Sequence, residues 1–203
     1  MAKRHSGQGE RSPEEEESFQ VGFATCLGHI AMQRVKLKAR LRTLEIQLLG
    51  RSGTKTLDSM AKIQSHRALN DAMAGAIKKS CSKRLFDQYI NLKALAEEAG
   101  LRAKLLLNGY WIRLDLNRLA LAPDQWLRNR IRHTAVLDSP PLSSPISPSE
   151  INSFPSYTLD DLNDLWKVMQ LITKELDELY LEVREAHDFV YNLQGPSKKN
   201  SIR

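Results

Sequence analysis

Apolar residues near the C-terminus recur at alternating steps of three and four positions. The members of this series, called the C-terminal stripe from here on, are Leu162, Leu165, Met169, Ile172, Leu176, Leu179, Val183, Ala186, Val190 and Leu193. Only an α-helix brings residues with this spacing onto one face, where they occupy the a and d positions of consecutive heptads. The pattern therefore predicts a C-terminal helix whose apolar face packs against another helix.

A second series with the same spacing lies toward the N-terminus. Its members are Leu27, Ile30, Arg34, Leu37, Leu41, Leu44 and Leu48. Arg34 weakens the apolar face but favours a fixed register. Ser12 and Pro13 predict the start of this helix, because serine caps helix N-termini and proline suits the first helical position. Gly50 predicts its end.

The region between the two series predicts further helices. Residues 54–79 and residues 83 to about 121 carry helical apolar spacing, with a break near 80–82. The Asn-Gly dipeptide at 108–109 favours a turn that divides the longer segment, whereas its flanking leucines favour a helix that runs through. Residues 123–133 predict a short basic helix, because a proline at the first position suits a helix start.

The composition changes over residues 138–157, where prolines and serines gather without periodicity. Proline removes backbone donors and disrupts helices, so this segment predicts an extended linker. Thr158 and Asp161 follow it with the spacing of a capping box, which predicts the start of the C-terminal helix. Gly195 predicts the end of that helix.

These elements predict an all-α fold, an elongated helical bundle with a C-terminal heptad (coiled-coil-like) helix joined by a Pro/Ser linker. A chain of 203 residues suits one domain with tails, or one domain plus a detachable helix. The predicted divisions are a disordered basic tail at 1–11, a basic helical body at 12–137, the linker at 138–157, an acidic heptad helix at 158–195 and a disordered tail at 196–203.

Charge is divided unequally along the chain. Residues 18–137 contain 21 Lys and Arg against 8 Asp and Glu, a net charge of +13, whereas residues 158–194 contain 3 against 9, a net charge of −6. One interpretation is two solvated helical surfaces that differ in sign. The other is that the acidic helix docks on a basic helix, in the same chain or in a complex, or that the body binds an acidic partner.

Residues beside the C-terminal stripe indicate what it binds. In a parallel homodimer, Glu175 would oppose Tyr180 and Glu182 would oppose His187, which gives little charge complementarity. Trp166 and Tyr180 also widen the apolar face, which favours packing into a bundle. We therefore expect heteromeric helical partners that are basic at the contact, and a homo-oligomer is less favoured. The residues expected at the partner-helix interface are Leu162, Leu165, Trp166, Met169, Ile172, Leu176, Leu179, Tyr180, Val183, Leu37, Leu41 and Leu44.

The sequence contains no pattern typical of catalysis, metal binding or cofactor binding. None of its five histidines has a second ligand three or four positions after it, and Cys26 and Cys81 match no metal-site spacing. We therefore expect a protein that is not an enzyme, with no catalytic, metal or cofactor residues. No apolar run reaches the roughly 18 residues of a membrane span. Two isolated cysteines favour a reducing compartment, cytoplasmic or nuclear.

Cationic residues support an alternative function, nucleic-acid binding through the basic body. Phosphate contacts need several cations on one face. The candidate contacts, to nucleic acid or to an acidic partner, are Lys36, Lys38, Arg40, Arg42, Arg128, Arg130 and Arg132. The first four alternate along the chain and spread around a helix, so a solvated face with ion pairs to the acidic helix is the competing interpretation.

Three serine–proline pairs lie in the predicted linker, at Ser139, Ser144 and Ser147. Proline-directed phosphorylation needs such an exposed, extended segment, and each phosphate would add roughly −1.5 to −2 charges beside a basic body. The competing interpretation is that serine and proline are simply common in linkers. The patterns together predict a non-enzymatic helical adaptor or scaffold subunit that assembles a multiprotein complex through helix–helix contacts.

Overall fold

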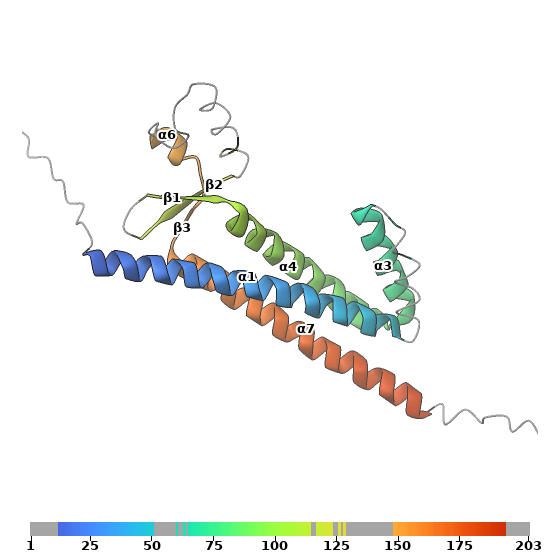
Figure 1. Ribbon diagram of the computed structural model, residues 1–203. Helices are drawn as coiled ribbons and strands as arrows, with labels where there is room; N and C mark the ends of the chain where they lie inside the picture. The colour runs from blue at the N-terminus through green and yellow to red at the C-terminus, as the bar shows by residue number, and fades with distance from the viewer. Residues whose placement is uncertain are drawn as a thin grey trace, which may run out of the picture. The chain divides into compact units, whose positions relative to one another are not determined.

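The computed structural model describes residues 12–50, 60, 63, 65–114, 117–123, 126, 128 and 148–193 (Figure 1). Its elements are α1 (Pro13–Leu49), α3 (His66–Ser80), α4 (Lys83–Asn108), β1 (Tyr110–Arg113), β2 (Leu119–Ala122), α6 (Pro148–Ile151), β3 (Ser156–Tyr157) and α7 (Leu159–Leu193). The described chain is mostly helical, as the apolar spacing predicts. It divides into a sheet unit, Met1–Met32 with Leu101–Lys167, and a helical unit, Gln33–Gly100 with Val168–Arg203. Helices α1, α4 and α7 contribute residues to both units.

Local hydrogen bonds explain where α1 begins and ends. The Ser12 hydroxyl accepts a hydrogen bond from the Glu15 backbone N–H (3.2 Å), and the Glu15 carboxylate accepts one from the Ser12 N–H (3.0 Å). This capping box satisfies amide groups that the first turn leaves without partners. At the other end, Gly50 has a φ of 62°, the left-handed conformation that ends a helix and that glycine adopts without steric cost. Both ends lie where the sequence predicts them.

Helix α7 begins with the predicted capping box. The Asp161 carboxylate accepts hydrogen bonds from the Thr158 backbone N–H (2.7 Å) and hydroxyl (2.8 Å), and the Asp161 N–H donates to the Thr158 hydroxyl oxygen (3.2 Å). Because the Thr158 backbone N–H, and then its hydroxyl, stabilise the ionised carboxylate, the pKa of Asp161 lies below its ordinary value.

The prediction of helix up to residue 121 is wrong beyond residue 108, where the chain forms strands. β1 pairs antiparallel with β2, with Tyr110 opposite Ala122, and β2 pairs antiparallel with β3, which gives the strand order β1-β2-β3. Leucine and alanine favour helix in isolation. All four residues of β2 are buried, however, so pairing and packing override that preference. The fold is therefore mostly helical with a small sheet rather than all-α.

Gly109 separates α4 from β1 and allows β2 to approach closely. A Cβ atom at this position would collide with the Leu121 side chain and would lie 3.1 Å from the Leu105 carbonyl oxygen. The Gly109 N–H donates a hydrogen bond to that same oxygen (3.0 Å) and so closes the last turn of the helix. The Asn-Gly pair therefore ends α4, in agreement with one of the two interpretations of the sequence.

The end of the proline-rich segment belongs to the sheet unit. Residues 138–147 lie outside the described residues. After them, Pro148–Ile151 forms the short helix α6, and Ser156–Tyr157 forms β3. The Leu121 N–H also donates to the Pro155 carbonyl oxygen (2.9 Å), which extends the contact between β2 and this segment. Residues 148–157 therefore include a helix and a paired strand, where the sequence predicts an extended linker.

Aromatic side chains pack α1 against the sheet. The ring of Trp111 on β1 meets Phe23 of α1 edge to face, with centroids 4.9 Å apart, and meets Tyr157 of β3 at 5.7 Å. The Trp111 indole N–H donates to the Leu106 carbonyl oxygen (3.1 Å) at the end of α4. One tryptophan thus contacts three elements of the sheet unit, through two aromatic contacts and one hydrogen bond.

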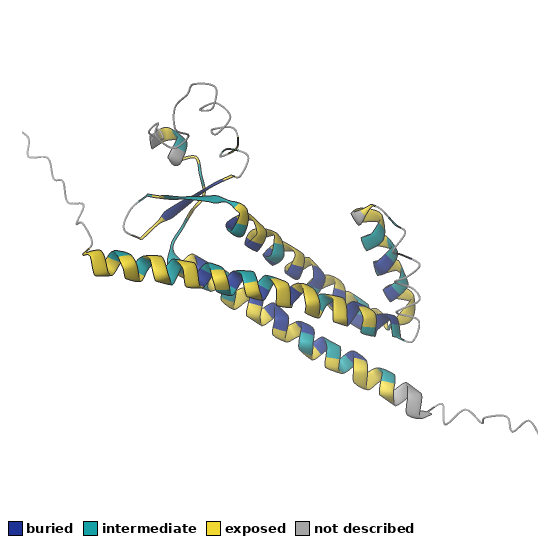
Figure 2. Cartoon of the chain, in the orientation of Figure 1, coloured by how far each residue is buried: buried dark blue, intermediate teal, exposed yellow. Residues whose placement is uncertain are grey.

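Aliphatic side chains form the core of the helical unit. Figure 2 shows buried positions recurring along α1, α4 and α7, with exposed positions between them. The largest side chains that are fully buried in this unit are Leu37, Leu44, Leu48, Ile77, Tyr89, Met169, Leu176 and Val183. Members of both predicted apolar series therefore contribute to the same core, together with residues of α3 and α4.

Candidate partner-binding groove

Most of the residues expected at a partner-helix interface pack inside the chain itself. On α7, the buried ones are Leu162, Met169, Ile172, Leu176, Leu179 and Val183, and the partly buried ones are Leu165, Trp166 and Tyr180. On α1, Leu37 and Leu44 are buried and Leu41 is partly buried. The C-terminal stripe therefore supplies the cores of the two units, and its buried members present little surface to a second protein.

One edge of α7 packs against α1 in the helical unit. The Gln33 side-chain amide donates hydrogen bonds to the Thr173 hydroxyl (2.8 Å) and the Met169 carbonyl oxygen (3.4 Å), and both Gln33 and Thr173 are buried. Farther along, the Arg40 guanidinium pairs with the Asp177 carboxylate (3.1 Å). The residue numbers of the partners increase together, so the two helices run parallel. Hydrogen bonds and an ion pair thus close this edge of α7.

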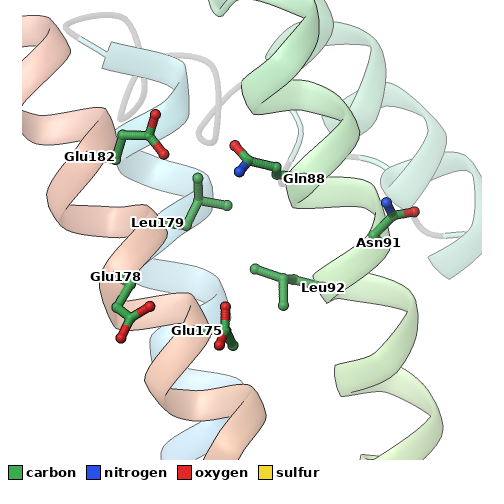
Figure 3. A pocket seen from close by; sticks show the side chains of 7 residues that line it. All are labelled: Gln88, Asn91, Leu92, Glu175, Glu178, Leu179 and Glu182. Carbon is green, nitrogen blue, oxygen red and sulfur yellow. The ribbon is translucent and has the colours of Figure 1, made fainter.

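The other edge of α7 faces α4 across an open groove of ≈ 280 Å³ (Figure 3). Arg84 of α4 forms an ion pair with Glu182 of α7 beside it. In Figure 3, residue numbers decrease along α7 as they increase along α4, so these two helices run antiparallel. The lining residues are Gln88, Asn91, Leu92, Glu175, Glu178, Leu179 and Glu182.

The groove combines an apolar centre with acidic sides. Figure 3 shows Leu92 and Leu179 reaching toward one another from the two helices. Glu175, Glu178 and Glu182 follow one another along α7 at steps of three and four residues, which places their carboxylates on one side of the helix. The groove therefore offers two kinds of contact at once, apolar surface and a row of negative charges.

The three carboxylates differ in their partners. Glu182 pairs with Arg84, and Glu178 lies 3.3 Å from the Lys174 ammonium group. Among the described residues, Glu175 has no cationic group within ion-pair distance. The side chains of Arg84 and Lys174 are mostly exposed, so each of these pairs contributes at most about 1 kcal/mol. The groove thus keeps an excess of negative charge that a cationic partner can use.

Exposed aliphatic side chains continue both faces of the groove. Leu95 follows Leu92 by three residues on α4 and is 50% exposed. On α7, Leu171 precedes Glu175 by four residues and is 62% exposed, and Val168 lies three residues earlier still with 47% exposed. Because residues three or four apart share a helix face, these side chains extend the groove beyond its acidic part. The whole surface, from Glu182 to Val168 on α7 and from Gln88 to Leu95 on α4, is called the α4–α7 surface below.

A second group of titratable side chains lies buried between α1 and α4. The Tyr89 hydroxyl donates to the Glu45 carboxylate (3.0 Å), which also accepts a hydrogen bond from Arg42 (3.3 Å) and lies 3.6 Å from the Lys93 ammonium group. Burial, and next the negative charge of Glu45, raise the pKa of Tyr89 far above its ordinary value. Because Tyr89 is fully buried and stays protonated, this cluster is suited to holding the helices together rather than to proton transfer with a substrate.

The proposed nucleic-acid contacts occupy different environments. Lys36 and Lys38 are exposed on α1, whereas Arg40 pairs with Asp177 and Arg42 with Glu45. Arg128 is exposed in the sheet unit. The predicted contacts Arg130 and Arg132, and the predicted phosphorylation sites Ser139, Ser144 and Ser147, lie outside the described residues. The structure therefore brings the first four cations onto one helix, where two of them contact acidic residues of the chain.

Among the described residues, no three His, Cys, Asp or Glu side chains lie close enough together to hold a metal ion. No helix in the described part of the chain is both long and apolar enough to cross a membrane. Both cysteines are free, and burial raises the pKa of the Cys26 thiol and of the Cys81 thiol.

The groove was not predicted from the sequence. Glu175 and Glu182 were recognised as neighbours of the C-terminal stripe, but Gln88, Asn91 and Leu92 were not expected beside them. The available signal was the acidic series on α7 at steps of three and four residues, which identifies one side of the groove only. In comparisons with protein-family models, curated proteins and solved structures, none matched this chain.

Proposed function

We propose that this chain is a non-enzymatic helical adaptor or scaffold subunit that assembles a multiprotein complex through helix–helix contacts. The observation that carries the proposal is the α4–α7 surface, an open groove between two helices that has leucines at its centre and exposed aliphatic side chains beside it. Contiguous exposed apolar surface of this kind is typical of protein-binding sites. A groove between helices is also a common site for binding an amphipathic helix.

The C-terminal stripe has a different role in this proposal. Its buried members hold α7 in the chain's own cores, in a parallel pairing with α1 that resembles the seam of a coiled coil. The pairing fixes α7 and thereby fixes the row of carboxylates on its other edge. The partner then binds the outer surface of α7 rather than the stripe itself.

Nucleic-acid binding through the basic body is the alternative, and exposed Lys36 and Lys38 on α1 favour it. Arg40 and Arg42 contact acidic groups of the chain, which leaves fewer cations for phosphates. A gel shift with RNA and DNA at two salt concentrations tests this alternative. A shift that weakens steeply with salt supports it, because each phosphate contact releases counterions, and no shift at low salt contradicts it.

Purification of the full chain from cells that express it tests the adaptor proposal. A tagged chain, isolated gently and passed through size exclusion, is expected to elute with another protein at a fixed stoichiometry. The complex should persist at salt concentrations of about 0.3 M, because apolar contacts are not screened. If the tagged chain, at the concentration it has in the cell, elutes without another protein in both the affinity step and size exclusion, the proposal is contradicted.

A further inference from the structure

The two edges of α7 differ in a way that indicates where a partner binds. Toward α1, Asp177 has Arg40 as its counter-ion and Thr173 has Gln33 as its hydrogen-bond donor. Toward α4, the carboxylate of Glu175 has no such cation among the described residues. Both edges of α7 therefore contain ion pairs within the chain. Among the described residues, only the groove edge has a carboxylate left over, that of Glu175, so this edge stays net negative beside an open groove.

The same open edge is apolar at one end. Leu95, Val168 and Leu171 are each about half exposed or more, although large aliphatic residues are usually buried. Helical spacing places them on the two faces that line the groove, one to two turns beyond Glu175. An acidic row followed by an apolar patch is complementary to a ligand that is basic at one end and apolar at the other.

We propose that the α4–α7 surface binds a basic amphipathic α-helix from another protein. The inference rests on the proposed adaptor function and names the chemistry of the partner. Lysine or arginine side chains of that helix pair with Glu175 and Glu178, and its aliphatic side chains cover Leu95, Val168 and Leu171. The surplus negative charge of the groove speeds association with such a helix and selects against acidic ones.

Spacing favours a helix over an extended peptide as the occupant. Glu175, Glu178 and Glu182 recur at steps of three and four residues. Lysine or arginine side chains on one face of a bound helix recur at the same steps, so the charges of the two helices can match. An extended segment presents side chains with a period of two and gains affinity by pairing with a free strand edge. Helices α4 and α7 offer no strand edge here, so a helix makes the better match.

Synthetic peptides test the inference on the full chain. The probe is a fluorescent amphipathic peptide of about 18 residues, long enough for helix, with leucines on one face and lysines beside them. A matched peptide carries glutamate in place of lysine, and another carries serine in place of leucine. We expect the leucine–lysine peptide to bind at least about tenfold more tightly than either, and its affinity to fall as salt rises from about 50 to about 500 mM.

Paired variants locate the binding site. Glu175→Gln with Glu178→Gln removes two groove charges. Asp188→Asn is the control on the same helix, because the Asp188 side chain is 70% exposed but lies on another face of α7. Leu171→Ala removes groove apolar surface, and Leu181→Ala is its control, because Leu181 is 52% exposed but lies on another face of α7. We expect each groove variant to weaken binding about fivefold or more, and each control to change it less than about twofold. Circular dichroism verifies that all variants keep their helical content.

The outcomes separate this inference from the adaptor proposal. Equal binding by groove variants and controls, or equal binding of the acidic peptide, overturns the groove assignment even where the chain still co-elutes with a protein partner. If the chain self-associates and the groove variants abolish this self-association, a second copy of the chain is the occupant, and the assignment of the groove to another protein is overturned. The Lys198→Ser, Lys199→Ser double variant tests whether the chain's own C-terminal segment occupies the groove. If this variant binds the peptide much more tightly, that segment is the occupant, and the groove assignment to another protein is overturned.

Discussion

The sheet unit and the helical unit place polar groups differently. In the sheet unit, Trp111 contacts Phe23 and Tyr157, and strand pairing satisfies the backbone around β2. All four polar or charged residues that are buried in the described chain, by contrast, belong to the helical unit: Gln33, Glu45, Lys93 and Thr173. Aliphatic helices slide past one another at little cost, whereas paired buried charges fix one register. The sheet unit thus buries aromatic contacts and keeps its ion pair between Arg113 and Glu16 partly exposed, whereas the helical unit buries charged groups in its core.

Loss of the buried carboxylate in the helical unit is expected to have the largest effect. Replacing Glu45 by Leu leaves the Tyr89 hydroxyl buried without its acceptor, and leaves the buried Lys93 ammonium group with only Glu97, at 3.9 Å, as a counter-ion. The free energy of unfolding should fall by about 3 kcal/mol, as for other buried ion pairs that lose one member. Urea denaturation followed by circular dichroism measures the change.

A double variant distinguishes a paired charge from simple loss of packing. Replacing Lys93 by Leu together with Glu45→Leu also removes the buried ammonium group, although Tyr89 still lacks its acceptor, so about 1 to 2 kcal/mol of the lost stability should return. If the double variant is less stable than Glu45→Leu alone, the pair does not act as a unit, and the contrast between the two units is wrong on this point.

In the sheet unit, a methyl group should be enough to disturb the packing. Gly109→Ala places a Cβ against the Leu121 side chain, and β2 has no exposed residue that would let Leu121 move into solvent. We expect the free energy of unfolding, measured by urea denaturation, to fall by about 2 kcal/mol. Gly100→Ala, within the preceding helix α4, is the control. Because nothing lies within 4 Å of its added Cβ, it should leave stability unchanged or raise it. An equal loss in both variants would contradict the packing explanation.

Alkaline pH should weaken the helical unit through Tyr89. Its pKa is raised above the ordinary 10.0, so the unfolded chain releases this proton as pH rises past 10 while the folded chain retains it. Stability is therefore lost on the alkaline side. Tyr89→Phe should lower the free energy of unfolding by about 1 kcal/mol at neutral pH, because the hydrogen bond to Glu45 is lost. Between about pH 8 and pH 11, the free energy of unfolding of this variant should fall less than that of the original chain. Tyr180→Phe serves as control, and equal alkaline losses in all three chains would refute the role of Tyr89.

Acid should weaken the sheet unit through the cap of α7, with the smallest effect of the four. The pKa of Asp161 is lowered by Thr158, so the cap stabilises the fold above the ordinary value of 3.8 and loses this effect as pH falls below it. Thr158→Ala should cost up to about 1 kcal/mol near pH 7 and less near pH 3. Amide hydrogen exchange of the first turn of α7 measures the local change. If the difference in exchange between Thr158→Ala and the original chain stays constant with pH, the acid sensitivity of the cap does not come from Asp161.

Helix ends and apolar faces were predictable because they depend on neighbours in the sequence. Ser12 and Thr158 cap their helices through residues three positions away, and Gly50 ends α1 through its own backbone conformation. Most buried positions of α7 likewise follow from spacing, although Thr173 is buried outside the C-terminal stripe and Ala186 within it is exposed. Each of these features needs information from within about two turns of helix.

The sheet and the groove were not predictable because each depends on segments far apart in the chain. The Leu-Ala-Leu-Ala sequence of β2 resembles helix until β1 and β3 pair with it on both sides. Leu92 and Leu179 likewise become parts of one groove only when α4 and α7 lie side by side. The sequence suggests that Arg40 pairs with the acidic helix, and the structure identifies Asp177 as its partner. The sequence does not indicate that the opposite edge of α7 borders an open groove.

The parallel pairing of α1 with α7 has a consequence for how the chain is made. Hydrogen bonds between them join residues 137 positions apart, for Cys26 and Asn163, and 140 apart, for Gln33 and Thr173. During synthesis, α1 leaves the ribosome on the order of ten seconds before the segment it pairs with. Its apolar face, with Ile30, Leu37 and Leu44, therefore stays uncovered by α7 throughout that interval. During that interval the nascent chain exposes apolar surface of the kind that favours aggregation and that molecular chaperones recognise in general.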